Sequence, residues 1–372
     1  MQTIDIKNLK ANEIIRKCVH CGFCLATCPT YQLLGDELDS PRGRIYLIKS
    51  ALENNDTSTD SLQHLDRCLT CRACETTCPS GVEYAQLLDV GREMLEKKRP
   101  VWQKVARYGV RKLLTTPMLF NPIGFIARHS KAQGALIKSK NTIGKVLLLG
   151  GCVQGVLAPN INHSVKNILA TLGYEVKETP QKQCCGAVDL HLSANEDALK
   201  KVKVNIDAWA EAEIIISSAS GCGVMVKDYP TLFDKEDTYY QKALKISQKT
   251  QDIAEFLADK DLSALKKDDK KISYHSPCTL QHGQKLGGLV ESILQQLGYN
   301  SATVQDGHLC CGSAGTYSIF QPKLSKQLKT NKLKNLQASN PEMIVTANIG
   351  CLMHLQKGSK IPVKHWVELL DN

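Results

Sequence analysis

Cysteines in two identical runs stand out in the first eighty residues of this chain of 372 residues. Both runs, Cys18–Pro29 and Cys68–Pro79, have the spacing C-x2-C-x2-C-x3-C-P. Three thiolates on such a tight loop can hold three irons of one cubic cluster, while the fourth cysteine ligates the neighbouring cluster. The spacing therefore predicts two 4Fe–4S clusters. The expected ligands are Cys18, Cys21, Cys24 and Cys78 for cluster one and Cys68, Cys71, Cys74 and Cys28 for cluster two.

Structural zinc is the alternative for these runs, because zinc sites also use paired C-x2-C motifs. Zinc needs only four ligands at variable spacing, whereas two identical runs, each closed by a proline, favour iron–sulfur clusters. Arg42 and Arg44 lie between the runs. They are expected to offset the negative charge of a cluster or to bind a carboxylate of a partner, with a solvated helix start as the alternative.

The other eight cysteines form a second pattern, which occurs twice. A single cysteine is followed by a Cys-Cys-Gly triplet and then by another cysteine, and the first two parts repeat at an offset of 126 residues. A vicinal pair with two distant thiolates suits an iron–sulfur centre or a redox-active disulfide, and we favour the centre. The candidate ligands are Cys152, Cys184, Cys185 and Cys222 for a third centre and Cys278, Cys310, Cys311 and Cys351 for a fourth.

The segments around these cysteines alternate between strand and helix patterns. Apolar runs at 145–149 and 271–275 lead to the first cysteine of each repeat, and Gly-Tyr pairs close the helical patterns that follow. Alternation of this kind predicts α/β units with a largely parallel sheet, and ligands collect at the carboxyl ends of such strands. The predicted fold is therefore α+β and multidomain, with an α-helical ferredoxin-like module followed by two duplicated α/β cysteine-rich units.

We expect four segments, named here the ferredoxin module (1–96), the basic connector (97–144), the first unit (145–268) and the second unit (269–372). From Lys97 to Lys145 there are twelve Lys and Arg and no Asp or Glu. Basic residues beside apolar ones suit an anionic membrane surface or an acidic partner. The alternative is a packed connector with a solvated basic face. No nucleic-acid-binding motif accompanies the charge, so nucleic acid is not expected as a partner.

Composition limits where the chain works. The net charge is +10, no run of eighteen apolar residues occurs, and the start of the chain lacks a signal-peptide pattern. Disulfides are rare in the cytoplasm, so sixteen cysteines there favour metal binding or redox chemistry. We expect a cytoplasmic protein that is peripheral on the inner face of the cytoplasmic membrane.

The flanks of these motifs carry a family resemblance over nearly the whole chain. It depends on segments such as Leu34-Gly-Asp-Glu-Leu-Asp39, Leu309-Cys-Cys-Gly-Ser-Ala-Gly315 and Ile344-Val-Thr-Ala-Asn-Ile-Gly-Cys351. With them the chain resembles the iron–sulfur subunits of bacterial glycolate oxidase. The resemblance implies FAD-containing partner subunits that oxidise glycolate to glyoxylate, and a quinone-type electron acceptor. No dinucleotide fingerprint occurs, so no flavin and no catalytic residue are predicted on this chain.

The repeats are also similar to the cysteine-rich repeats of heterodisulfide reductase, whose unit ends in C-x-x-C. Met225 and His354 stand at the second of these positions here, so His354 is a candidate ligand, with an ordinary surface histidine as the alternative. Five further residues are expected either to support the centres and the quinone side or to make ordinary hydrogen bonds: Asp189, His191, His275, His282 and His308.

Three other functions stay open from the sequence alone. The first is the equivalent subunit of a glycerol-3-phosphate or lactate dehydrogenase. The second is a thiol–disulfide enzyme like heterodisulfide reductase, against which the missing fifth cysteine of each repeat argues. The third is a zinc-stabilised nucleic-acid-binding protein that uses the positive charge.

Overall fold

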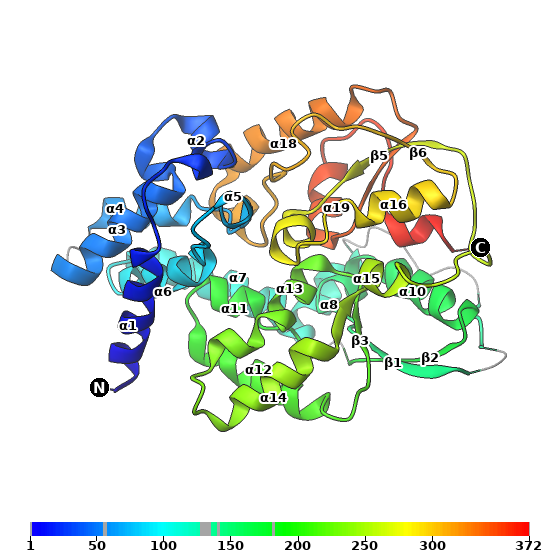
Figure 1. Ribbon diagram of the computed structural model, residues 1–372, viewed down its shortest axis with the longest axis horizontal. Coiled ribbons are helices and arrows are strands. Elements are labelled where there is room, and N and C mark those ends of the chain that lie inside the picture. Colours follow the sequence, from blue (N-terminus) through cyan, green and yellow to red (C-terminus); the bar gives the residue numbers. More distant parts are fainter. Residues whose placement is uncertain (1, 55–57, 127–134, 140–141, 181–182, 372) are drawn as a thin grey trace.

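The computed structural model describes residues 2–54, 58–126, 135–139, 142–180 and 183–371. Its helical N-terminal part lies at the left in Figure 1, beside two α/β units, of which the second lies above the first. This arrangement confirms the predicted fold class. The boundaries of the four segments stay a prediction.

The ferredoxin module is entirely helical in the described residues. Pro29 occupies the first turn of α2 directly after Cys28, where its missing N–H costs no hydrogen bond. Ser58 caps the N-terminus of α4. Leucine and isoleucine side chains from α3, α4 and α6 form its core, among them Ile48, Leu65 and Leu88. The elements are α1 (Gln2–Arg16), η1 (Phe23–Leu25), α2 (Pro29–Leu34), η2 (Glu37–Asp39), α3 (Pro41–Asn54), α4 (Thr59–Asp66), α5 (Ala73–Thr77) and α6 (Tyr84–Glu96).

The first unit is a four-stranded parallel sheet in the order β2-β1-β3-β4. Apolar residues recur on one face of α10 at Ile161, Val165 and Ile168, and this face packs into the core. The elements are β1 (Gly144–Leu148), α9 (Gln154–Leu157), α10 (Pro159–Thr171), β2 (Tyr174–Glu178), α11 (Ala187–His191), α12 (Asn195–Ala208), β3 (Ile215–Ser217), α13 (Ser220–Lys227), η3 (Tyr229–Leu232), α14 (Thr238–Lys249), β4 (Thr250–Asp252) and α15 (Ile253–Leu257).

The second unit repeats this topology with the strand order β6-β5-β7-β8, again all parallel. Gly173 and Gly298 follow equivalent helices of the two units, and both have φ of +90°, a left-handed conformation that favours glycine. The elements are β5 (Lys271–His275), η4 (Thr279–Gly283), α16 (Leu289–Gln296), β6 (Asn300–Ala302), α17 (Tyr317–Phe320), α18 (Pro322–Gln337), β7 (Met343–Thr346), α19 (Ile349–Gln356), β8 (Val363–His365) and η5 (Trp366–Leu369).

The two units join through the loops that follow their strands. The hydroxyls of Ser220 and Thr279 lie 2.7 Å apart, and Asn348 Nδ2 donates to Ser220 Oγ at 3.0 Å. His365 Nε2 lies 3.0 Å from the carbonyl oxygen of Ser218. One apolar core contains side chains of both sheets. The carboxyl ends of the two sheets, where the cysteines lie, are therefore close together.

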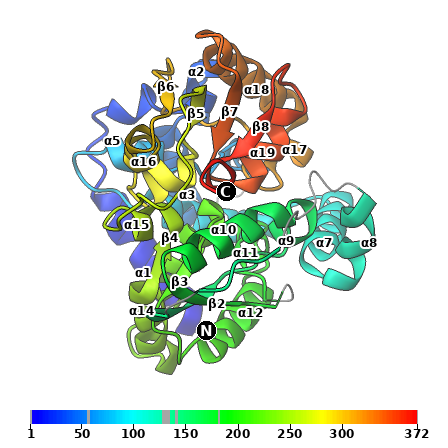
Figure 2. The same ribbon diagram turned by 90° about the vertical axis from the view of Figure 1, so that its right-hand side faces the viewer.

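The basic connector contains α7 (Val101–Thr115) and α8 (Pro117–Ile126), which project at one side of the molecule in Figure 2. The buried face of α7 carries Arg107 and Arg111, whereas Trp102 and Val105 are exposed. Arg99 holds both carboxylate oxygens of Asp66, at 2.6 and 2.9 Å. Residues 127–134 and 140–141 of the connector lie outside the described residues.

Ion pairs explain why the arginines of α7 are buried while apolar side chains of the same helix are exposed. Arg107 reaches Asp66 of the ferredoxin module at 3.7 Å, and Arg111 reaches Asp189 of the first unit at 3.1 Å. The expectation of a solvated basic face is therefore wrong for α7, because its arginines join two parts of the fold. Within the part of the chain that the structure describes, no helix is long and apolar enough to cross a membrane.

Candidate functional site

Two cavities in the ferredoxin module are lined by cysteine side chains. The first has Cys18, Cys21, Cys24 and Cys78 in its wall, with Cys74 at the same wall. The second has Cys28, Cys68, Cys71 and Cys74 in its wall. Each cavity thus combines three cysteines of one run with the last cysteine of the other run. The ligand sets themselves stay a prediction.

The two cavities differ in exposure. Cys21 is exposed, and the neighbouring Val19 and Phe23 are 67% and 61% exposed, so the first cavity lies at the surface. All four cysteines around the second cavity are buried, which places it inside the molecule. An electron donor outside the chain therefore reaches the first cavity more easily than the second.

Burial makes free thiolates unfavourable at these positions. Desolvation raises the pKa of Cys24 to about 11 and raises the pKa values of Cys71 and Cys74 well above the ordinary value. Metal coordination supplies the positive charge that makes a buried thiolate stable. Four sulfur donors around an otherwise apolar cavity fit an iron–sulfur cluster.

The backbone of the two cysteine loops has the same unusual conformation, and hydrogen-bond donors are directed at a cysteine sulfur. His20 and Thr70 occupy the same place in the two runs, and both have positive φ, 53° and 52°. Thr70 N donates to Cys68 Sγ at 3.4 Å, and the hydroxyl of Tyr84 donates to the same sulfur at 3.7 Å. Donors directed at sulfur stabilise negative charge on the ligand.

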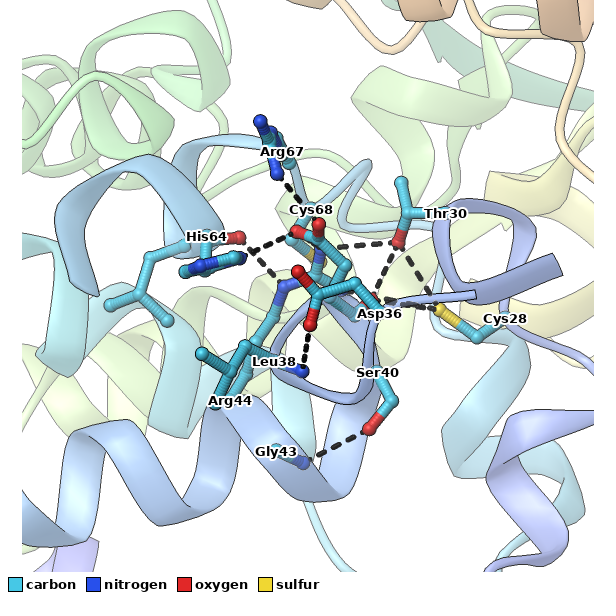
Figure 3. Close-up of polar contacts among 12 residues, drawn as sticks. Cys28, Thr30, Asp36, Leu38, Ser40, Gly43, Arg44, His64, Arg67 and Cys68 are labelled. Carbon is cyan, nitrogen blue, oxygen red and sulfur yellow. Dashed lines mark hydrogen bonds and ion pairs between the residues drawn. The ribbon is translucent and has the colours of Figure 1, made fainter. Parts of the chain in front are cut away.

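A buried ionic network supports the second cavity, shown in part in Figure 3. Asp39 is fully buried and accepts from Arg44 at 3.2 Å and from Arg67 at 2.8 Å, with His64 at 3.1 Å. Arg44 Nη1 also lies 4.0 Å from Cys28 Sγ. Arg44 is therefore buried beside a cysteine sulfur and is not part of a solvated helix start.

Asp39 has a central place in this network that no sequence pattern indicates, although it ends the segment 34–39 that carries the family resemblance. Its partners come from separate parts of the ferredoxin module and meet only on folding, so no local spacing marks it. Arg42, by contrast, pairs with Glu37 at 2.5 Å on the half-exposed surface.

The four cysteines of the first unit lie side by side at the carboxyl end of the sheet. Cys152 Sγ is 3.5 Å from Cys184 Sγ, and Cys185 contacts both Cys184 and Cys222. Cys184 and Cys185 are buried, whereas Cys152 and Cys222 are half-buried. The structure therefore brings all four candidate ligands of the third centre together.

The second unit has the same arrangement but is more enclosed. Cys278 Sγ is 3.8 Å from Cys310 Sγ, and Cys311 contacts both Cys310 and Cys351. All four are buried. All sixteen cysteines lie within the described residues, and none of them forms a disulfide. Four convergent sulfurs fit a metal centre in each unit.

The glycine after each vicinal pair has a conformational role. Gly186 and Gly312 have φ of +90° and +87°. A Cβ at Gly312 would lie 2.7 Å from the carbonyl oxygen of Ser325. The left-handed backbone and the close approach of α18 thus require glycine at position 312. The N–H of Gly312 also donates to Cys310 Sγ at 3.5 Å.

The loop of the second cavity packs directly on the second unit. Leu69, Cys71 and Ala73 form one apolar cluster with Cys278 and Cys310 and with two further side chains, Tyr317 and Leu328. The same loop reaches the first unit through an ion pair between Arg72 and Asp228. Sequence patterns gave no signal for the apolar contact between this loop and the second unit, whose segments are about 200 residues apart in the chain.

The histidines and the aspartate named from the sequence have different surroundings. Asp189 is buried and makes ion pairs with Arg111 and Lys201, and His191 Nδ1 lies 3.4 Å from Asp89, so both have partners other than sulfur. His354 Nε2 lies 3.3 Å from Ser325 Oγ. Burial lowers the pKa of His275 to about 3, so its imidazole is neutral.

His282 links the ferredoxin module with the second unit. Its Nδ1 lies 3.1 Å from the hydroxyl of Thr76 in α5, and its Nε2 lies 2.9 Å from the carbonyl oxygen of His308. His308 in turn lines a cavity of about 540 Å³ at the edge of the second sheet, together with Tyr274, Ser276 and Glu291. This cavity therefore lies next to the loop that carries Cys278.

Comparison with known proteins agrees with this geometry. A model described as a 4Fe-4S dicluster domain matches residues 14–82, and a model described as a cysteine-rich domain matches residues 146–227 and 272–356. The chain is 47% identical to the glycolate oxidase iron–sulfur subunit of Escherichia coli, over 99% of this chain and 96% of that one.

Two more distant relatives complete the comparison. The chain is 27% identical to the probable glycolate oxidase iron–sulfur subunit of Bacillus subtilis, over 95% of this chain and 92% of that one. It is 26% identical to lactate utilization protein A of Shouchella clausii, over 61% of this chain and 98% of that one. The likeness to lactate utilization proteins thus covers only part of the chain.

Proposed function

This chain belongs to the family of glycolate oxidase iron–sulfur subunits, and from that premise we propose that it carries electrons from a flavoprotein partner towards a quinone-type acceptor. The partner subunits hold FAD and oxidise glycolate to glyoxylate, while this chain binds no flavin. The full-length likeness at 47% identity favours this function over that of a lactate or glycerol-3-phosphate dehydrogenase subunit, and over a thiol–disulfide enzyme.

Two 4Fe–4S clusters would be held in the ferredoxin module. The grouping of cysteines around the two cavities supports the exchange of the last ligand between the runs. Bound clusters supply one-electron transfer. The protein residues supply thiolates, direct hydrogen bonds at sulfur and exclude water from the second cavity. The ligands would be Cys18, Cys21, Cys24 and Cys78 for cluster one and Cys28, Cys68, Cys71 and Cys74 for cluster two.

The proposed order of electron transfer follows from the burial of the two cavities. The observation that carries the proposal is the contact between the loop of cluster two and the second unit. Cluster one lies at the surface and accepts electrons from the flavoprotein. Cluster two is buried, and its loop shares an apolar cluster with Cys278 and Cys310. Electrons therefore pass from cluster one to cluster two and then to the second unit.

Each cysteine-rich unit would hold one further iron–sulfur centre. Four sulfurs converge in each, without a fifth cysteine. The ligands would be Cys152, Cys184, Cys185 and Cys222 in the third centre and Cys278, Cys310, Cys311 and Cys351 in the fourth. Among the described residues, only the fourth centre contacts the loop of cluster two through an apolar cluster, so it is the one in line with the relay.

The quinone-type acceptor would bind in the 540 Å³ cavity of the second unit. Its wall combines hydroxyl, carboxyl and imidazole groups from Tyr274, Ser276, Glu291 and His308, which can hydrogen-bond quinone oxygens. The hydroxyls of Tyr274 and Ser276 are buried without a partner among the described residues. Burial raises the pKa of Glu291, which favours its neutral, donating form.

The chain would bind the inner face of the cytoplasmic membrane peripherally through α7 and α8. Apolar side chains cover the outer surface of these helices, and Lys97 and Lys98 are exposed beside them. An apolar surface flanked by lysines suits anionic lipid. The exposed apolar residues are Val101, Trp102, Val105, Tyr108, Met118, Leu119 and Ile126.

Sedimentation with vesicles of phosphatidylglycerol and phosphatidylcholine tests this surface. We expect the wild-type chain to bind and the double variant Trp102→Gln, Leu119→Gln to lose binding. Val204→Gln is the matched control, since Val204 is 61% exposed on α12, away from these helices. Equal binding of the double variant and the wild type would exclude α7 and α8 as the membrane surface.

Reconstitution tests the relay itself. The flavoprotein partner with glycolate and a soluble quinone should reduce the quinone rapidly only when this chain is added. The variant Cys78→Ser should remove cluster one and abolish this stimulation. Quinone reduction at the full rate by the flavoprotein alone would contradict the proposed function.

A further inference from the structure

His275 occupies a position in the second unit that differs from the other histidines of the chain. It ends β5, three residues before Cys278, and it is 2% exposed. A ring nitrogen of His275 and the sulfurs of Cys311 and Cys351 all lie within 4.8 Å of one another. His275 thus faces two of the four sulfurs of the fourth centre.

The two ring nitrogens of His275 have different surroundings. Nδ1 lies 3.0 Å from the hydroxyl of Thr346, on the neighbouring strand β7. Nε2 is buried and has no hydrogen-bond partner among the described residues. A buried ring nitrogen without a partner is unfavourable, and a histidine held at one nitrogen by a hydroxyl is a common arrangement for a metal ligand at the other. The tautomer with the proton on Nδ1 leaves a lone pair on Nε2.

The described part of the first unit has no counterpart of this group. The offset of 126 residues between the units places Leu149 at the position of His275. Leu149 is also buried and packs against Cys185. The last part of the repeat has an offset of 129 residues, as between Cys222 and Cys351, so Ser217 stands at the position of Thr346. Its hydroxyl donates to the carbonyl oxygen of Ala219 instead. The nitrogen donor is therefore specific to the second unit.

The other candidate nitrogen ligand is already engaged. His354 is the histidine that the sequence pattern indicates as a ligand, but its Nε2 lies 3.3 Å from Ser325 Oγ. Its nitrogens do not belong to the group formed by Cys311, Cys351 and His275. Of these two histidines, His275 is thus the one grouped with the sulfurs, and its Nε2 has no hydrogen-bond partner among the described residues.

We propose that His275 ligates the metal centre of the second unit through Nε2, beside the four cysteines of that unit. The inference rests on the proposed function, because it requires an iron–sulfur centre in the second unit. Imidazole is a neutral ligand, and ligand identity tunes the reduction potential of an iron–sulfur centre. The fourth centre therefore differs in potential from the third centre, which has no nitrogen donor.

Pulsed electron paramagnetic resonance on the anaerobically purified full chain tests the ligand. In the wild type labelled with ¹⁵N-histidine, we expect a nitrogen coupling on a centre beyond the two ferredoxin clusters. The variant His275→Leu, which copies the first unit, should lose this coupling and shift the potential of that centre. The control His354→Leu should keep both. A coupling that persists in His275→Leu, or that disappears in His354→Leu, would overturn the proposal.

Further measurements separate a failure of the His275 proposal from a failure of the proposed function. If His275→Leu fails to fold, His275→Cys should restore the centre without nitrogen coupling, and the labelled wild type needs no variant at all. A wild type with only about eight irons per chain, which is two 4Fe–4S clusters, would refute the centres of the proposed function. A wild type that has the additional centre but shows no histidine coupling would refute the role of His275 alone.

Discussion

The two cysteine-rich units share a scaffold and differ in what surrounds their sulfurs. In the first unit, Cys152 and Cys222 are half-buried and Leu149 faces the site. In the second unit, all four cysteines are buried and His275 faces the site. Duplication thus preserved the four donors while their environments diverged, so the units are not interchangeable parts of one relay.

The two units also differ in how they contact the rest of the chain. The first unit is joined to the basic connector through Arg111, whose charge meets the buried Asp189. The second unit meets the loop of cluster two through apolar side chains and through the hydrogen bond between Thr76 and His282. Ion pairs hold the first unit in place, whereas the close apolar contact would make the second unit the electron acceptor in the proposed relay.

The largest expected effect is a loss of electron delivery when a cysteine of the second unit is replaced. Cys310→Ser should slow the reoxidation of the reduced ferredoxin clusters by a soluble quinone by roughly 100-fold or more, because the next centre in line is damaged. Stopped-flow absorbance of the prereduced chain measures this rate. Cys184→Ser, the equivalent change in the first unit, should have a much smaller effect. Equal losses would mean that both units lie in the relay.

Removal of Arg111 should destabilise the first unit. Arg111→Met leaves Asp189 buried with Lys201 as its remaining cation, and breaking a buried pair costs about 3 kcal/mol. Urea denaturation measures the change in the free energy of unfolding. The control Lys112→Met removes only a half-exposed pair with Asp197 and should cost less than about 1 kcal/mol. Equal costs for the two variants would contradict the role of Arg111.

The pH dependence of stability should have opposite signs in the two units. Asp252 and His365 end equivalent strands, and each forms a capping box. Burial raises the pKa of Asp252 from 3.8 to about 7, so the stability it contributes is complete below 3.8 and is lost as pH rises through 7. Burial lowers the pKa of His365 from 6.5 to about 4, so its contribution is present above 6.5 and is lost as pH falls through 4.

Variants that keep a capping side chain isolate these two contributions. The stability of the wild type relative to Asp252→Asn should fall between about pH 4 and pH 7. Relative to His365→Asn it should fall as pH decreases from 6.5 to about 4. Urea midpoints measured across this range give both differences. Parallel pH profiles for both variants would show that these two groups do not behave as their burial indicates.

The smallest expected effect concerns the hydrogen bond between the ferredoxin module and the second unit. Thr76→Val removes the partner of His282 Nδ1 and should lower the free energy of unfolding by about 1 kcal/mol. Thr76→Ser keeps the hydroxyl and should restore most of the loss. A Thr76→Ser variant as unstable as Thr76→Val would attribute the effect to packing and not to the hydrogen bond.

Features that depend on residues close in the chain could be predicted from the sequence. They include the spacing of the cysteines, the duplicated Cys-Cys-Gly pattern and the glycines that end helices, such as Gly173 and Gly298. These local features led to the correct fold class and to the parallel sheets.

Features that remote partners decide could not be predicted in this way. The charge pattern of the basic connector suggested a solvated basic face, but ion pairs with Asp66 and Asp189 hold Arg107 and Arg111 of α7 inside the fold. The contact between the loop of cluster two and the second unit depends on tertiary packing, for which the sequence carries no local signal. The nitrogen of His275 became significant only when its distance to two sulfurs was known.

The most direct test of the account measures magnetic interaction between centres in the anaerobically reduced chain. Clusters one and two should couple to each other, and if cluster two and the fourth centre are also neighbours, electron paramagnetic resonance should show an additional spin–spin splitting that Cys310→Ser removes and Cys184→Ser retains. The chain should also contain more than about eight irons. A chain with eight irons or fewer, or an additional splitting that survives Cys310→Ser, would contradict the proposed transfer from the ferredoxin module to the second unit.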